Sequence, residues 1–269
     1  MKTKVLLFLG GMTATLGCES RGTNDIVFFD GRAVEAIGDS VIAVTKSPEA
    51  VVEVLDLRTD ETTTFGGGQL QGPFHVQFAA NRWFVSDVVD GAPSISVFDQ
   101  ARGGPPVFAG RIDLSGLTTL PHQFAVLPDG RIVVEAPDNM LIAVADDSVS
   151  TFALTERGPR PSVIVGTRGG VLHAVPDHHL TLYNAFGHIR WRTEWPWNEN
   201  AFVTDIAVDE RSRIHVLAGI QETAEGLFRV YSLVGETGEV VWWSEPGTYA
   251  TFVVSTFGNV TADSTGRWF

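Results

Sequence analysis

The sequence predicts an all-β protein made of radially arranged four-stranded antiparallel blades, a β-propeller. Three observations predict this fold. A short strand-like phrase recurs at the spacing of a propeller blade, and the segments between strands are turns such as Asp-Gly, Gly-Gly and Pro-Asp-Gly. No long segment has the 3.6-residue apolar period of an amphipathic helix.

The recurring phrase has two apolar residues around one variable position, then one further residue and a final small polar residue. It occurs at residues 52–56, 95–99, 142–146, 180–184 and 228–232. The final residues are separated by 43, 47, 38 and 48 positions. Repeats of about 40–45 residues made only of strand-like segments are typical of propeller blades.

Five repeat units follow from this spacing, and each has room for about four strands. They cover residues 32–72, 73–120, 121–160, 161–200 and 201–247. The third unit is the clearest, with expected strands at 124–127, 131–134, 141–145 and 150–154. The turn Pro128-Asp129-Gly130 joins the first two of these strands.

The two ends of the chain predict a sixth blade. Residues 259–269 have the pattern of an inner strand, a turn and the beginning of a second strand, and residues 26–30 form a lone strand before the first unit. Because a closed ring removes exposed strand edges, this lone strand could complete the last blade. We therefore expect six blades with the last one incomplete, and the alternative is a five-bladed ring with two stray strands.

The N-terminal segment is typical of an export signal, with Lys2 and Lys4 before an apolar stretch that is too short to span a bilayer. Residues 15–18, Thr-Leu-Gly-Cys, resemble a bacterial lipobox, although Thr15 and Leu16 depart from its usual residues. This resemblance implies cleavage before Cys18 and lipidation of its thiol. The alternative is an ordinary signal peptide with an incidental cysteine.

The expected domains are a signal peptide at 1–17, an anchor and short linker at 18–24, and the propeller at 25–269. Glu19 follows the cysteine, which in enteric-type bacteria favours the outer membrane. We thus expect a lipid-anchored protein of the bacterial cell envelope that faces the periplasm or the cell surface. Since Cys18 is the only cysteine, no internal disulfide can form.

The net charge of −13 limits the classes of partner. Nucleic-acid binding needs a basic footprint, so it is excluded, and so is a protein that lies flat on anionic lipid. A solvated acidic surface that aids solubility explains the charge, and a cation site is the alternative. We expect a monomer.

Residues 121–134 resemble an NHL-type blade motif, and residues 206–209 with 213–216 resemble it more weakly. The resemblance implies a six-bladed propeller superfamily that includes binding scaffolds, lyases, lactonases and peptide-processing enzymes. Residues 187–191 and 237–242 are similar to outer-strand phrases of quinoprotein-like propellers, in which the tryptophans dock neighbouring blades. Trp191 and Trp242 are therefore expected to pack between blades. Because the first three units lack such tryptophans, a quinone cofactor is disfavoured.

In a propeller, the loop into each inner strand and the loop after each second strand reach one face around the central channel. The repeat alignment places polar residues there: His75, His122, Ser162 and Thr204 before inner strands, and Lys46, Asp87, Glu135, Asp177 and Gln221 after second strands. Of these, we predict His75, His122, Asp87, Glu135, Asp177, Gln221 and Lys46 as ligand-binding residues.

Histidines and carboxylates at one channel suit a divalent metal or general acid–base work, so His75 and His122 are candidate metal ligands. The alternative is that all of these groups are polar strand ends facing water. His173, His188 and His215 fall within strands, where half-exposed positions are expected.

Signatures of common hydrolases are absent from the sequence, which has no Gly-x-Ser-x-Gly, no His-Glu-x-x-His and no cysteine-based metal spacing. The sequence therefore favours a lipid-anchored binding or scaffold module for a protein, peptide or glycan ligand. The second hypothesis is a lyase or hydrolase at the central channel, which requires a divalent metal as cofactor.

Overall fold

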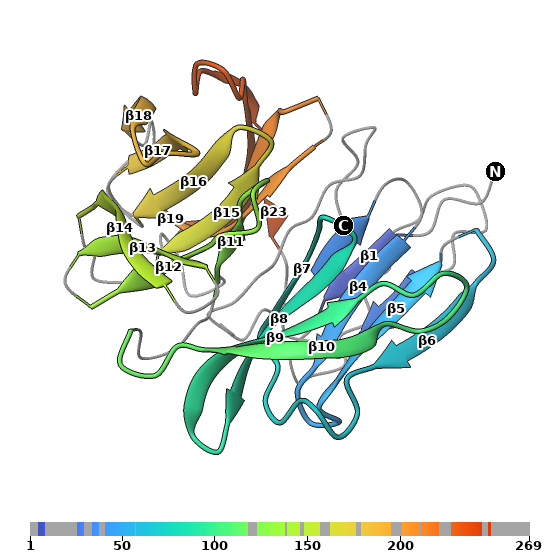
Figure 1. Cartoon of the computed structure of the whole chain (residues 1–269). Coiled ribbons are helices and arrows are strands. Elements are labelled where there is room, and N and C mark those ends of the chain that lie inside the picture. Colours follow the sequence, from blue (N-terminus) through green and yellow to red (C-terminus); the bar gives the residue numbers. More distant parts are fainter. Residues whose placement is uncertain are drawn as a thin grey trace.

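The computed structural model describes most of the repeat region (Figure 1). The described residues are 5–8, 26–29, 34–37, 41–56, 58–117, 123–137, 139–145, 148–156, 162–175, 179–194, 201–209, 211–220, 227–243 and 247–248. Every regular element in these ranges is a β-strand. The described residues therefore contain no helix that is long and apolar enough to cross a membrane.

The strands form five antiparallel blades, and each blade is one continuous segment of chain. Blade 1 contains β3 (Val34–Ile37), β4 (Val41–Lys46), β5 (Val51–Asp56) and β6 (Glu61–Phe65). Blade 2 contains β7 (His75–Ala79), β8 (Arg82–Val89), β9 (Ala92–Asp99) and β10 (Val107–Asp113). Blade 3 contains β11 (Ala125–Val126), β12 (Ile132–Ala136), β13 (Met140–Ala145) and β14 (Ser148–Leu154).

The last two blades follow the same order. Blade 4 contains β15 (Val163–Thr167), β16 (Gly170–Val175), β17 (His179–Asn184) and β18 (Ile189–Glu194). Blade 5 contains β19 (Ala201–Val208), β20 (Ile214–Ile220), β21 (Leu227–Leu233) and β22 (Val240–Trp243), and the short β23 (Gly247–Thr248) also pairs with β21.

The prediction of six blades is wrong for the described residues, which form five, as in the stated alternative. The five repeat units correspond one to one to these blades. Strand β2 (Ile26–Phe29), expected to complete a sixth blade, pairs in parallel with β1 (Val5–Phe8) in a separate two-stranded sheet. The other fragment, residues 259–269, lies outside the described residues. The spacing of residues 26–29 did not specify their pairing partner, so the expected sixth blade was wrong for that strand.

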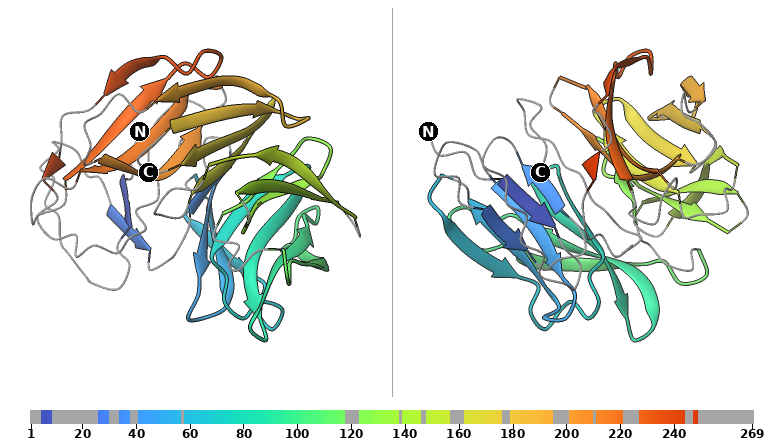
Figure 2. Two further views of the ribbon diagram at one scale, coloured as in Figure 1. Left: turned by 90° about the vertical axis from the view of Figure 1, so that its left-hand side faces the viewer. Right: turned by 180° about the vertical axis from the view of Figure 1, so that it is seen from behind.

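Consecutive blades pack through their inner strands, which contact each other in the order β3, β7, β11, β15 and β19. The blades therefore follow one another in an arc (Figure 2). Separate apolar clusters fill the space between neighbouring blades. The cluster between blades 1 and 2 includes Val52, Phe65 and Trp83, and the cluster between blades 4 and 5 includes Leu172, Leu180 and Tyr231. Both faces of a middle strand, such as the second strand of a blade, are consequently buried.

The recurring phrase lies on the third strand of each blade, although its last residue in blade 3, Asp146, is outside the described residues. In blades 1 and 4 its final polar residue closes the following turn. The Asp56 carboxylate accepts the backbone N–H of Arg58 at 2.8 Å. The Asn184 side chain accepts the N–H groups of Phe186 at 2.9 Å and His188 at 3.0 Å. A short polar side chain that bonds the backbone two residues ahead stabilises such a turn.

Trp191 docks blade 4 onto blade 5, which confirms its expected packing role. Its indole N–H donates to the carbonyl oxygen of Gly235 at 2.9 Å, and the Thr193 hydroxyl donates to that of Gly238 at 3.2 Å. Trp242 on β22 is 45% exposed. No further blade follows β22 among the described residues, so the packing role of Trp242 stays a prediction.

Replacement of Gly238 tests this contact between blades. A Cβ atom there would lie 2.7 Å from the Trp191 ring and 2.5 Å from Thr193 Oγ1, at a φ of +73°. We expect Gly238→Ala to lower the free energy of unfolding by about 2–4 kcal/mol, from overpacking and backbone strain together. Urea denaturation measures the loss.

Gly116→Ala is the matched control, because Gly116 has a φ of +77° and a Cβ atom added there would meet nothing within 4 Å. It carries the backbone strain alone, about 1–2 kcal/mol. Equal losses for the two variants would contradict the assigned contact.

Candidate functional site

Two faces of the propeller differ in how the chain passes through them. We call the loop face the one at which the chain enters the inner strands and passes from second to third strands. It includes residues 47–50, 66–74, 90–91, 123–124, 155–156 and 162. The turn face is the opposite one and includes residues 80–81, 128–131, 168–169, 185–188 and 211–213.

The described members of the predicted site do lie at the loop-face ends of their strands. They are Lys46, His75, Asp87, Glu135 and Ser162. His122, Asp177 and Gln221 lie outside the described residues, as does the side chain of Thr204. The ligand-binding and metal-binding roles of the whole set therefore remain predictions.

His75 begins β7, the inner strand of blade 2, and its ring packs edge-on against Phe124, with centroids 5.2 Å apart. Burial lowers the pKa of His75 to about 4, so the imidazole is neutral at pH 7. Its ring nitrogens make no hydrogen bond within the described part of the chain. A neutral imidazole beside an aromatic ring can ligate a metal or contact an organic ligand.

Asp87 is fully buried and turned back toward the loop that precedes β7. Its carboxylate accepts the backbone N–H of Gly72 at 2.7 Å and that of Gln71 at 3.2 Å. A carboxylate with these hydrogen bonds satisfies otherwise unpaired backbone donors of the loop. Asp87 therefore shapes the loop face.

Two further predicted residues have partners within the protein. Lys46 forms an ion pair with Glu53 at 2.9 Å inside blade 1. The Ser162 hydroxyl donates to the Glu135 carboxylate, and this bond links blade 3 to the beginning of blade 4. Ser162 and Glu135 are thus brought together, whereas no hydrogen bond or ion pair within the described ranges joins His75, Asp87 and Lys46 to one another.

A second polar group at the loop face was not predicted. It lies between blades 3 and 4 and consists of Thr155, Glu156, His173, His179 and Arg192. His173 was expected to be half-exposed, but its exposed fraction is 0%. It sits in β16, a middle strand with both faces packed. The sequence signal that could have predicted the burial of His173 is its position in the apolar run 171–175.

Hydrogen bonds and ion pairs tie this group together. His173 Nδ1 lies 3.1 Å from Thr155 Oγ1, and His179 Nδ1 lies 3.9 Å from Glu156 Oε2. Arg192 forms an ion pair with Glu156 at 3.0 Å. Burial, with smaller contributions from His179 and Arg192, lowers the pKa of His173 to about 3. The His173 imidazole is therefore neutral at pH 7.

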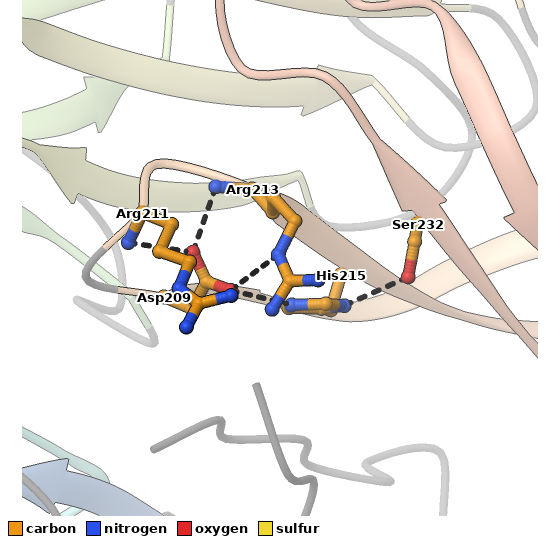
Figure 3. Close-up of polar contacts among 5 residues, drawn as sticks. All are labelled: Asp209, Arg211, Arg213, His215 and Ser232. Carbon is orange, nitrogen blue, oxygen red and sulfur yellow. Dashed lines mark hydrogen bonds and ion pairs between the residues drawn. The ribbon is translucent and has the colours of Figure 1, made fainter. Parts of the chain in front are cut away.

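A third polar group lies at the turn face of blade 5 and has the composition of a catalytic triad (Figure 3). His215 Nδ1 lies 2.9 Å from Ser232 Oγ, and His215 Nε2 lies 3.5 Å from Asp209 Oδ2. His215 was expected to be half-exposed, but it is 2% exposed because β20 is also a middle strand.

Three features give this group a structural role. Asp209 accepts hydrogen bonds from the backbone N–H groups of Arg211 and Arg213 and from the Arg213 side chain, at 2.8–2.9 Å. The pKa of His215 is lowered, chiefly by burial, whereas a catalytic base needs a pKa near the working pH. Ser232 is 7% exposed within β21. The group holds the 209–213 turn onto the two middle strands.

Among the described residues, no three His, Cys, Asp or Glu side chains are placed to hold a metal ion together.

Comparison with known proteins supports the fold. No family model matches the sequence, and no curated protein matches it. A protein of unknown function from Bacteroides caccae has a TM-score of 0.61 at 12% identity, over 86% of this chain and 85% of that chain. Streptogramin B lyase has a TM-score of 0.54 at 10% identity, over 88% of each chain. Virginiamycin B lyase from Staphylococcus aureus has a TM-score of 0.53 at 10% identity, over 86% of this chain and 88% of that chain. These likenesses show a β-propeller.

Burial of neutral His173 makes stability depend on pH. Its folded pKa of about 3 lies below the unfolded value of 6.5, so its contribution is complete above pH 6.5 and is lost as pH falls toward 3. We expect His173→Gln to reduce the fall in unfolding free energy below pH 6 by about 1.4 kcal/mol per pH unit relative to wild type.

Urea denaturation at a series of pH values measures this slope. His188→Gln is the control, because His188 is exposed at the turn face, and its slope should match wild type. An unchanged slope in His173→Gln would show that His173 is not buried in the neutral form.

Proposed function

We propose that this chain is a binding or scaffold propeller that a lipid on Cys18 holds at the bacterial cell envelope. Its ligand, a protein, peptide or glycan, binds at the loop face. Loops held on a rigid scaffold are the usual place for such a site. The acidic net charge is consistent with a partner other than nucleic acid.

One observation carries the proposal: the three described charged residues of the predicted site interact with other groups of the protein itself. Asp87 holds the loop before β7, Lys46 pairs with Glu53, and Glu135 binds Ser162. Residues used in this way stabilise a preformed surface. A preformed surface favours binding because little conformational entropy is lost when the ligand binds.

His75 and Phe124 supply the ligand-contacting part of this surface. The imidazole can donate one hydrogen bond and accept another while it is neutral, and the neighbouring aromatic ring adds apolar area. This combination suits a peptide or a sugar, both of which present hydrogen-bonding groups next to apolar patches.

The second candidate is a metal-dependent lyase or hydrolase with its site at the channel. The observation in its favour is the neutral imidazole of His75 at the loop face. Two neighbours in fold are lyases by name, but at 10% identity this likeness concerns the fold alone. The engagement of Asp87 by backbone donors favours the binding module.

Binding of the full chain, purified in detergent, to glycan and peptide arrays tests the proposed ligand class. We expect a saturable ligand whose affinity falls at least about tenfold in His75→Gln, equivalent to about 1.4 kcal/mol. Arg58→Gln is the control, because Arg58 is exposed at the turn face and should bind as wild type does. A ligand chemically converted by the wild type, with conversion lost in His75→Gln, would establish the enzyme instead.

The anchor is tested by replacing its cysteine. We expect the wild-type chain in the membrane fraction, from which detergent but not high salt releases it. The reason is that an acyl chain anchors a protein by burying its methylene groups in the bilayer, an interaction that salt does not weaken. Cys18→Ser should shift the protein out of the detergent-released fraction. Metabolic labelling with a fatty acid provides the direct readout, and a wild-type chain without label would contradict the lipid anchor.

A further inference from the structure

The buried histidine between blades 3 and 4 contacts a hydroxyl that has two acceptors in reach. Thr155 Oγ1 lies 3.3 Å from the carbonyl oxygen of Glu156 and 3.1 Å from His173 Nδ1. When the hydroxyl donates its single proton to the carbonyl, its oxygen accepts the proton of His173 Nδ1. His173 Nε2 then has a lone pair.

This lone pair is buried and has no hydrogen-bond partner among the described residues. A buried acceptor without a donor is destabilising unless a bound species interacts with it. Thr155 binds His173 Nδ1, the ring nitrogen that would not face the ion. Metal-ligating histidines commonly have such a partner on their second nitrogen, which fixes the tautomer and the ring orientation.

His179 is placed to share the same species. In the antiparallel pair of β16 and β17, His173 is opposite Thr181 and Val175 is opposite His179. His173 and His179 are thus diagonal neighbours on one face of the blade, with Cβ atoms about 7–8 Å apart or slightly less. Two imidazoles at that separation can reach one ion with their Nε2 atoms, at about 2.0–2.1 Å each.

The carboxylate of Glu156 completes the arrangement. It lies 3.9 Å from His179 Nδ1, so it favours a proton on that nitrogen and leaves Nε2 for a ligand. Arg192 binds the other carboxylate oxygen at 3.0 Å and keeps the side chain in place. Because Glu156 is 60% exposed, the group borders solvent, which gives an ion a route of access.

We propose that His173 and His179 form a binding site for a transition-metal ion, with Zn²⁺ as its reference ligand. Neutral imidazole nitrogens favour Zn²⁺ or Cu²⁺, whereas Mg²⁺ and Ca²⁺ require oxygen ligands. Water would fill the remaining positions of a tetrahedral ion. This site is separate from His75 and does not depend on the proposed function.

Calorimetric titration of the full chain with Zn²⁺, in detergent after removal of metals by a chelator, tests the proposal. We expect one ion per chain, and a visible ligand-field spectrum when Co²⁺ replaces Zn²⁺. Mg²⁺ should produce no heat of binding at this site. Binding should fall at least tenfold in both His173→Gln and His179→Gln.

Two matched variants separate this site from other histidines. His188→Gln, at an exposed position, is the control and should keep the wild-type affinity for Zn²⁺, whereas His75→Gln tests whether the predicted channel site holds the metal instead. Loss of binding in His75→Gln with full binding in His173→Gln would assign the metal to the channel and overturn the proposal. No stoichiometric binding by the wild-type chain would overturn it directly, without reference to the folding of any variant.

Discussion

Burial of both faces of the second strand of each blade is the constraint on which the rest of this structure depends. Among the described residues, blades 2, 3 and 4 each present one face to the blade before and the other face to the blade after, and apolar clusters fill the spaces between neighbouring blades. Polar side chains that enter this region must be satisfied internally. The buried hydrogen bonds of Asp87 and Asp209 are consequences of that requirement, because each carboxylate accepts backbone donors of an adjoining loop or turn.

The same constraint determines which polar groups remain available for chemistry. At the loop face, hydrogen bonds and ion pairs within the protein engage most charged groups, whereas two neutral imidazoles, His75 and His173, are kept in that form by burial. Their surroundings differ. His75 lies beside an aromatic ring at the end of an inner strand, which suits an organic ligand. His173 lies deeper, among groups that orient its nitrogens, which suits an ion.

The fold could be predicted from sequence because two-sided burial and turn closure leave a repeated local signal. The phrases ending at Asp56 and Asn184 are examples, with apolar positions inside and a polar side chain closing the turn. The blade count could not be predicted, since the partner of a lone strand such as residues 26–29 depends on long-range pairing. The burial of His173 could have been predicted, because the continuous apolar run 171–175 indicates a strand packed on both faces. The direction of Asp87 was hidden, since its donors lie in the loop before β7.

Each blade is a single uninterrupted segment, and its strands pair in chain order. Most strand pairing therefore joins residues close in sequence, which corresponds to a low contact order for an all-β protein and to comparatively fast folding. A chain of this kind can acquire structure vectorially, one blade after another, each new blade adding to the exposed face of the last as in other repeat proteins. Gain or loss of a whole unit by recombination would likewise preserve every pairing within the remaining blades.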